Sequence, residues 1–163
     1  MQKIIILRGN SGSGKTTVGK AIQEKVGQGT MLISQDVIRR EILYVKDRPG
    51  NKAVDLLETM VKFAYDNCEL AILEGILNVD KYQKLFDTVI SLYGENIFAY
   101  YFDLPFEETL ERHKLKPQAA EYGEEEMRKW WQEKDYIPNI REENLVKEMS
   151  EAEILALIYE DIR

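Results

Sequence analysis

The sequence predicts an α/β fold in which helices cover both faces of a parallel sheet. Short apolar runs alternate along the chain with longer amphipathic stretches, which is the pattern of parallel strands joined by crossover helices. The first run, residues 4–7, is apolar at every position, as expected of a strand buried on both faces. A glycine-rich turn then joins this run to the first amphipathic stretch.

The predicted strands of the first half are short apolar runs bounded by glycine or polar residues. We expect strands over residues 3–8, 30–33 and 70–73. A helix over residues 15–26 has apolar side chains at helical spacing and ends at Gly27. A short helix follows over residues 35–44, and Asn51 can cap the helix after it.

The clearest amphipathic helix of the second half covers residues 80–93, with large apolar side chains on one face. Strands are expected over residues 97–103 and 144–147, the latter short. The remaining helices are predicted from Pro105 to about residue 116, over residues 123–134, and from Ser150, where Glu153 completes a capping box.

Length and composition indicate one globular domain. The 163 residues are expected to form a single domain, residues 1–163. Hydrophobic residues make up 44% and charged residues 31%, as in ordinary globular proteins. The single cysteine excludes an intramolecular disulfide framework, and no apolar run approaches the ~18 residues that span a bilayer. We therefore expect a cytoplasmic location.

The charge balance limits the classes of partner. The formal net charge is −7, from 22 basic and 29 acidic residues. This balance argues against long nucleic acids and anionic membranes, whose binders usually carry a basic surface. It does not exclude a small phosphate-bearing molecule, because a basic pocket can lie within an acidic protein. The sequence does not indicate an oligomeric state.

Residues 9–16 match the phosphate-binding loop (P-loop) motif G-x-x-x-x-G-K-[ST] at every fixed position. They are Gly9, Asn10, Ser11, Gly12, Ser13, Gly14, Lys15 and Thr16, and Thr17 follows them. Glycines allow the backbone to curl so that several N–H groups face phosphate oxygens. Lys15 can reach the β- and γ-phosphates, and the Thr16 hydroxyl can bind Mg²⁺. The motif predicts nucleotide binding but not the reaction.

Three classes of P-loop protein compete for this chain: kinases, switch GTPases, and mechanical or regulatory ATPases. A GTPase reads guanine with an N-K-x-D motif after a late strand, whereas Asn51-Lys52 is followed by Ala53-Val54 and opens a helix. Mechanical ATPases usually need a longer chain. The size and layout favour a kinase, and a regulatory or switch ATPase without a small-molecule acceptor remains the alternative.

Asp36 and Arg39 follow the second predicted strand, at the sheet edge where α/β proteins bind ligands. Three residues apart, they share one helix face. A carboxylate there can accept the proton of an attacking hydroxyl, and an arginine can hold a phosphate or orient the acceptor. The alternative is that Ser34 or Asp36 merely caps a short helix, with Arg39 exposed to solvent.

A P-loop followed by a short strand and a D-x-x-R segment resembles the small P-loop kinases of the polynucleotide kinase, zeta-toxin and chloramphenicol phosphotransferase type. More distantly, it resembles gluconate and adenylylsulfate kinases. The resemblance covers most of the chain as a layout. It implies a three-layer α/β/α P-loop NTPase fold, with a five-stranded parallel sheet in the order 2-3-1-4-5 and a short helical lid. It also implies that Asp36 is the general base and that Arg39 binds substrate or phosphate.

Glu74 and Gly75 end the third predicted strand. In the nucleotide kinases that the chain resembles, an acidic residue at this place organises Mg²⁺, so Glu74 is a candidate metal residue together with Thr16. The alternative is an acid that only ends the strand. Asn78 is expected to cap the helix that begins at Asp80.

The resemblance places a lid at about residues 112–135. Lids supply cations that stabilise charge on the phosphoryl group being transferred. Polynucleotide kinase carries its lid arginine near the position of Lys116, but a lysine lacks the bidentate fork of arginine. Arg112 and Arg128 are therefore the candidate lid cations. The alternative is a solvated helix with ion pairs such as Glu108 with Arg112.

These features predict an ATP- and Mg²⁺-dependent kinase that phosphorylates a hydroxyl group of a small molecule. The acceptor class stays open among nucleosides, sugars, antibiotics and nucleotide sugars. The catalytic candidates are Lys15, Asp36, Arg39, Arg112 and Arg128. The nucleotide-binding candidates are residues 9–17, and the metal candidates are Thr16 and Glu74.

Overall fold

A five-stranded parallel sheet runs through the molecule in the computed structural model, which describes residues 1–163. The strand order is β2-β3-β1-β4-β5. From one edge to the other the strands are Met31–Ser34 (β2), Leu70–Gly75 (β3), Lys3–Gly9 (β1), Ile97–Asp103 (β4) and Glu142–Val146 (β5). The predicted α/β fold, the parallel sheet and the order 2-3-1-4-5 are confirmed.

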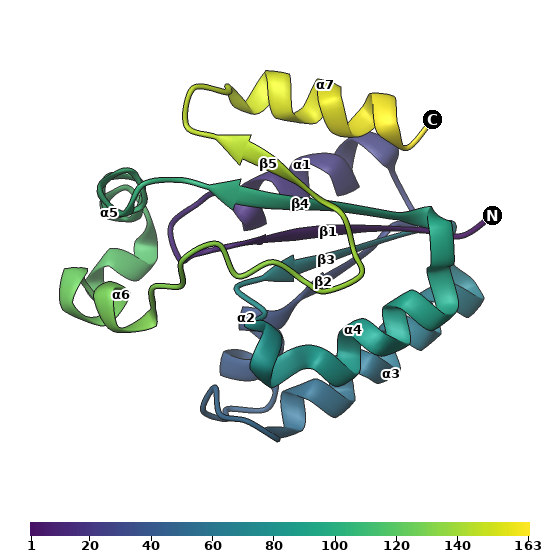
Figure 1. Ribbon diagram of the computed structural model, residues 1–163, viewed down its shortest axis with the longest axis horizontal. Helices are drawn as coiled ribbons and strands as arrows, with labels where there is room; N and C mark the ends of the chain where they lie inside the picture. The colour runs from purple at the N-terminus through teal and green to yellow at the C-terminus, as the bar shows by residue number, and fades with distance from the viewer.

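Helices cover both faces of this sheet (Figure 1). One face carries α1 (Lys15–Val26) and α7 (Glu151–Asp161), and the other carries α3 (Lys52–Asn67) and α4 (Val79–Tyr93). A 3₁₀ turn over Gly94–Asn96 leads from α4 into β4. None of the helices combines the length and the apolar composition that a membrane-spanning segment requires.

The central strand β1 explains why its apolar run is continuous. Ile4 and Ile6 belong to the core beneath α3 and α4, whereas Ile5 and Leu7 belong to the core beneath α1 and α7. All four side chains are fully buried. Burying a side chain of this kind stabilises the folded state by about 1.5–3 kcal/mol. The strand β1 therefore stabilises the helix layers on both faces of the sheet and holds the start of the loop that follows it.

The carboxyl ends of the strands meet at one edge, on the left of Figure 1, and the remaining short elements gather there. They are α2 (Gln35–Val37) with a π-helical turn over Ile38–Ile42, α5 (Phe106–Lys114), a 3₁₀ turn over Pro117–Ala120, and α6 (Glu124–Trp130). Ligands of open α/β sheets bind at this edge. The fold therefore brings the candidate residues after β1, β2 and β3 together.

Two predicted helices differ from the observed ones. The segment 35–44 is a three-residue α-helix and a π turn, in which the Leu43 N–H donates to the Ile38 carbonyl at 2.9 Å. The segment 123–134 is helical only over Glu124–Trp130. The backbone of Trp131 is extended, and its N–H donates to the Arg128 carbonyl, which ends the helix. In both cases contacts with distant residues override local helix propensity.

Candidate active site

The P-loop leaves β1 at Gly9 and enters α1 at Lys15. Gly9, Gly12 and Gly14 have φ values of +145°, +81° and +100°, which favour glycine. A side chain at Gly12 would also place its Cβ 2.5 Å from the Thr109 carbonyl oxygen in α5. The loop therefore needs glycine both for its curvature and for its close approach to α5. Thr17 lies beyond the loop and is exposed.

Lys15 is buried inside the curl of the loop. Its ammonium group donates to the Asn10 carbonyl at 2.7 Å and to the Ser13 hydroxyl at 3.1 Å. Burial lowers the pKa of Lys15 to about 8, and the nearby carboxylates of Glu74 and Asp36 oppose this effect. The ammonium group is thus held where bound phosphates would replace its present partners.

Glu74 ends β3 with its side chain directed at the P-loop helix. It is 1% exposed, and its Oε1 accepts a hydrogen bond from the Thr16 hydroxyl at 2.9 Å. The strand register explains the position, since Glu74 lies beside Leu7 of β1 and Ser34 of β2. One carboxylate and one hydroxyl beside a phosphate site fit Mg²⁺, which usually takes its other ligands from water and phosphate. No group of three or more His, Cys, Asp or Glu residues gathers as an all-protein metal site.

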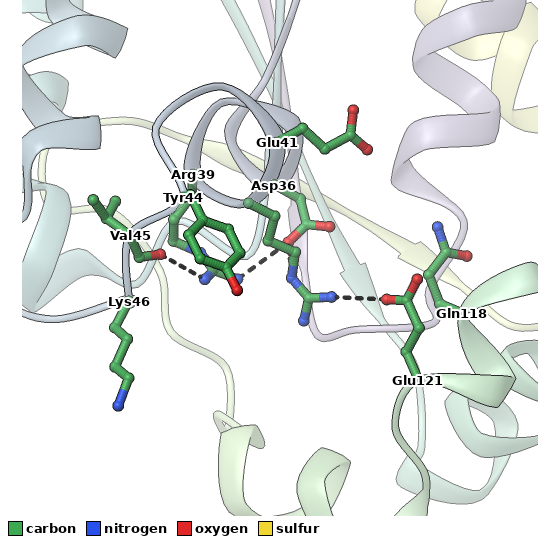
Figure 2. A pocket seen from close by; sticks show the side chains of 9 residues that line it. Asp36, Arg39, Glu41, Tyr44, Val45, Lys46, Gln118 and Glu121 are labelled. Carbon is green, nitrogen blue, oxygen red and sulfur yellow. Dashed lines mark hydrogen bonds and ion pairs between the residues drawn. The ribbon is translucent and has the colours of Figure 1, made fainter.

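Asp36 and Arg39 face an open cavity of about 590 Å³ between the π turn and residues 118–121 (Figure 2). The Asp36 carboxylate lies 3.3 Å from Nη2 of Arg39 and 3.1 Å from Nε of Arg40, and its side chain is half exposed. Arg39 is not solvated: its side chain is 16% exposed and it donates to the Val45 carbonyl at 3.2 Å. Its Nε is buried and has no partner.

Ser34 occupies the N-cap of α2, where its hydroxyl accepts from the Val37 N–H at 3.5 Å. The carboxylate of Asp36 is therefore not needed as a cap and stays available at the cavity. Asn78 occupies the N-cap of α4, but its side chain makes no capping hydrogen bond.

Lys116 joins this group of charges, although the sequence analysis preferred Arg112 and Arg128. Burial lowers the pKa of Lys116, while Glu74 and Asp36 raise it and Arg112 lowers it. Lys116 also lowers the pKa of Lys15. Glu74 and Asp36 thus act electrostatically on both lysines. The signal in the sequence was its place just before Pro117.

Arg112 and Arg128 lie in different surroundings. Arg112 donates through Nη1 to the Ser13 carbonyl of the P-loop at 2.8 Å and pairs with Glu108 at 3.0 Å. Arg128 pairs with Glu124 at 2.7 Å, lies over the Phe106 ring at 4.3 Å, and remains largely exposed. Arg112 thus touches the phosphate-binding loop, whereas no contact of Arg128 links it to that loop.

Arg8 is a buried residue of this edge that the sequence analysis missed. It is 0% exposed and donates to the Leu77 carbonyl at 3.0 Å. Its guanidinium also pairs with Asp135 at 2.9 Å and Glu142 at 2.8 Å. These partners are 69 to 134 positions away along the chain, so no local pattern could have revealed them.

Comparisons with known proteins agree with this fold. A family model described as AAA domain matches residues 4–135. The APS kinase of Mycobacterium tuberculosis, in complex with AMPPNP and APS, has a TM-score of 0.68 at 21% identity, and the alignment covers 98% of this chain and 96% of that one. A putative kinase from Chloroflexus aurantiacus has a TM-score of 0.72 at 15% identity, covering 99% and 96%.

A gluconokinase from Sinorhizobium meliloti has a TM-score of 0.60 at 17% identity, and the alignment covers 98% of this chain and 95% of that one. No curated protein matches the chain in sequence. At these identities the solved structures show a shared fold, and the residues of the site must carry the argument about chemistry.

Proposed function

From the premise that the chain belongs to the AAA domain family, we propose that it is a kinase that transfers the γ-phosphoryl group of ATP to a hydroxyl of a small molecule. The observation that carries the proposal is the half-exposed Asp36 carboxylate, which lines an open cavity and whose negative charge raises the pKa of the buried P-loop lysine. Nucleotide binding alone does not need a carboxylate facing an acceptor cavity, whereas hydroxyl phosphorylation uses one as a proton acceptor.

The proposed roles follow from the contacts. The P-loop amides and Lys15 hold the phosphates, and Asp36 accepts the proton as the acceptor oxygen attacks the γ-phosphorus and ADP leaves. Arg39 orients the acceptor. Mg²⁺, held by Thr16 and through Glu74, would neutralise charge on the phosphates.

Two lid cations are candidates for stabilising the transferring group. Lys116 lies among the charges of Lys15, Glu74 and Asp36, and Arg112 contacts the Ser13 carbonyl of the P-loop at 2.8 Å. Arg128 would take part only if the α5–α6 segment moved, because its present partners are Glu124 and Phe106. In this proposal residues 112–135 act as the lid of a single kinase domain.

Two of the similar structures support a small-molecule acceptor. They are an APS kinase, solved with AMPPNP and APS, and a gluconokinase. The D-x-x-R spacing of Asp36 and Arg39 supports a closer relation to one group of small kinases, that of polynucleotide kinase, zeta-toxin and chloramphenicol phosphotransferase. The net charge of −7 favours a small acceptor over a long nucleic acid within that group.

Asp36→Asn tests the proposal, with radiolabelled ATP, Mg²⁺ and a panel of acceptor hydroxyls. We expect transfer to fall by at least about 100-fold, as for loss of a general base, while ATP affinity measured by calorimetry changes less than about threefold. Asp66→Asn, an exposed residue of α3, is the matched control and should behave as wild type. If Asp36→Asn leaves turnover unchanged, the regulatory or switch ATPase becomes the better account.

A further inference from the structure

The lining of the acceptor cavity is balanced in charge. It carries three cations and three anions, which are Arg39, Arg40 and Lys46 against Asp36, Glu41 and Glu121. On the P-loop side, Arg112 likewise has an acid beside it, because it pairs with Glu108 at 3.0 Å. The acceptor cavity therefore offers no excess of positive charge to an anionic acceptor.

The arginines of the acceptor cavity are already paired within the chain. Both Arg39 and Arg40 bind Asp36, at 3.3 and 3.1 Å, and Arg40 also contacts Glu121 at 3.4 Å. Figure 2 shows Arg39 reaching Asp36 at the edge of the cavity. Arg40 lies over the Tyr122 ring at 5.2 Å as well. An anionic group would have to displace these carboxylates, and Lys46 is the one cation of the lining without an ion-pair partner.

Hydroxyl groups suit this lining better than a phosphate or carboxylate does, because each hydroxyl both donates and accepts. Carboxylates, guanidinium groups and the Gln118 amide alternate around the cavity, and the exposed Tyr44 ring adds an apolar surface. A volume of about 590 Å³ fits a small molecule. We propose, on the basis of the proposed function, that the acceptor is an uncharged, hydroxyl-rich compound of the sugar or polyol class.

Matched acceptor pairs test this inference. Glucose is compared with glucose 6-phosphate and gluconate, ribose with ribose 5-phosphate, and inositol with inositol phosphate, by transfer of label from ATP. We expect kcat/KM to favour the uncharged member by at least about tenfold. Equal or faster phosphorylation of the anionic members overturns the inference but leaves the proposed kinase intact. Failure of every acceptor, with ATP hydrolysis that is insensitive to Asp36→Asn, overturns both.

Glu121→Gln provides a sharper test in the same assay. It removes a partner of Arg40 and gives the lining a net positive charge, so the preference for uncharged acceptors should shrink by about tenfold. Glu125→Gln, on exposed α6 and paired with Lys129 at 3.2 Å, is the control and should keep the wild-type preference. An unchanged preference in Glu121→Gln contradicts the charge argument.

A separate observation concerns Asn10, which the sequence motif marks only as a variable P-loop position. Its side-chain amide donates to the Gln132 carbonyl at 2.8 Å and its Oδ1 accepts from the Gln132 N–H at 2.8 Å. Residues 131–141, called the strap here, run from α6 to β5 (Figure 1). The P-loop is therefore hydrogen-bonded directly to the strap at the point where α6 ends.

Other contacts hold the same region. Arg8, two residues before Asn10, binds Asp135 of the strap at 2.9 Å, and the Asp135 carboxylate also accepts from the Val79 N–H at 3.0 Å. On the other side of α6, the Tyr122 and Ser11 hydroxyls lie 3.0 Å apart. We infer that Asn10 is a positioning residue, whose side chain holds the α5–α6 segment over the P-loop and keeps water from the phosphates.

The two tryptophans of the chain, Trp130 and Trp131, stand where α6 meets the strap, so their fluorescence reports this contact without a label. Asn10→Ala should increase acrylamide quenching by about twofold and speed hydrogen exchange in residues 115–135. It should also raise ATP hydrolysis without acceptor by about fivefold, at a KM for ATP within about threefold of wild type.

Tyr136→Phe is the control for the strap, because its hydroxyl contacts Asn144 at 2.7 Å and not the P-loop. It should keep wild-type quenching and hydrolysis. Tyr122→Phe removes the contact with Ser11 and should change quenching in the same direction as Asn10→Ala. Wild-type quenching and exchange in a folded Asn10→Ala overturn the inference. If Asn10→Ala does not fold, wild-type quenching in Tyr122→Phe overturns it.

Discussion

Arg8 is a buried charged residue in the central strand β1. Its partner Glu142 is also fully buried, at 2.8 Å. Arg8→Gln leaves this carboxylate without its counter-charge, so we expect the free energy of unfolding to fall by about 3–5 kcal/mol. Urea denaturation measures the loss.

An exposed ion pair provides the comparison for Arg8. Lys129→Gln breaks the contact with Glu125 and should cost about 0–1 kcal/mol. If Arg8→Gln costs no more than Lys129→Gln, the guanidinium is not the structural anchor that its contacts indicate.

Lys15 makes nucleotide binding dependent on pH. Burial lowers its pKa to about 8 in the free protein, whereas bound phosphates favour the charged form and raise it. ATP affinity should therefore be full below pH 8 and fall by up to about tenfold per unit above it. Calorimetry in two buffers of different ionisation enthalpy should show proton uptake near pH 8.

Lys15→Arg is the control for this prediction, since a guanidinium stays protonated over the whole range. Whatever its affinity for ATP at pH 7, that affinity should not vary between about pH 7 and 9.5. A flat profile for the wild-type protein would contradict the assignment of this titration to Lys15.

Residues of the site differ in how far a sequence can indicate them. Lys15 and Thr16 are indicated by a contiguous motif, because one loop supplies the whole phosphate cradle. Lys116 depends on the chain returning to the P-loop about 100 residues later, and the two carboxylates that raise its pKa come from β3 (Glu74) and α2 (Asp36). The sequence favoured Arg112 for its bidentate fork, and no local pattern could show that Lys116 interacts with the same carboxylates.

At the scale of elements, long amphipathic helices were predicted well and short polar ones were not. The helix over residues 80–93 is observed as Val79–Tyr93, and the capping box of Ser150 and Glu153 begins α7 as expected. The segments 35–44 and 123–134 deviate because they contact distant residues, as in the pair of Arg40 with Glu121 and the hydrogen bonds between Gln132 and Asn10. Cys68 lies just beyond α3 and is partly exposed.

Acid should weaken the interface between α3 and α4, because Glu58 becomes protonated. Hydrogen bonds from Lys62, Lys84 and Thr88 lower the pKa of Glu58 to about 2. Because the folded-state pKa is depressed, this contribution is present above about pH 4.5 and is lost as pH falls towards 2. We expect Glu58→Gln to cost about 1 kcal/mol or less at pH 7.

The cost of Glu58→Gln should shrink as the pH falls towards 2, because the wild-type carboxyl becomes increasingly protonated there. Denaturation curves at both pH values measure the difference. Glu95→Gln, in the exposed turn before β4, should show no such pH-dependent gap. A constant gap for Glu58→Gln would indicate lost packing instead of lost charge pairing.

At the scale of the whole molecule, ATP binding at the site should raise the free energy of unfolding. A ligand present at 100 times its Kd and bound only by the folded state adds about 2.7 kcal/mol, which for a chain of this size raises Tm by roughly 5–10 °C. We expect this shift with ATP and Mg²⁺ in a thermal melt. Lys15→Ala should remove most of it, and an undiminished shift in that variant would mean that ATP binds elsewhere.

At the same scale, the net charge of −7 can be related to where the charged residues lie. Lys15 lies in the P-loop and Arg112 donates to its Ser13 carbonyl, so a locally basic site can attract a nucleotide while the acidic molecule as a whole repels long polyanions. A molecule with a basic face for nucleic acid would need these cations spread over a larger surface.

By itself, the sequence determined the α/β class, the P-loop and the long helices, because apolar periodicity and contiguous motifs are local properties of the chain. The strand order needed the resemblance to known kinases. Only the tertiary structure decided that Arg8 anchors the strap, that Asn10 binds Gln132, and that Lys116 joins Lys15 at the site. Each of these contacts joins residues far apart in the chain, and their energies depend on burial and distance, which exist only once the sheet has brought its carboxyl ends together.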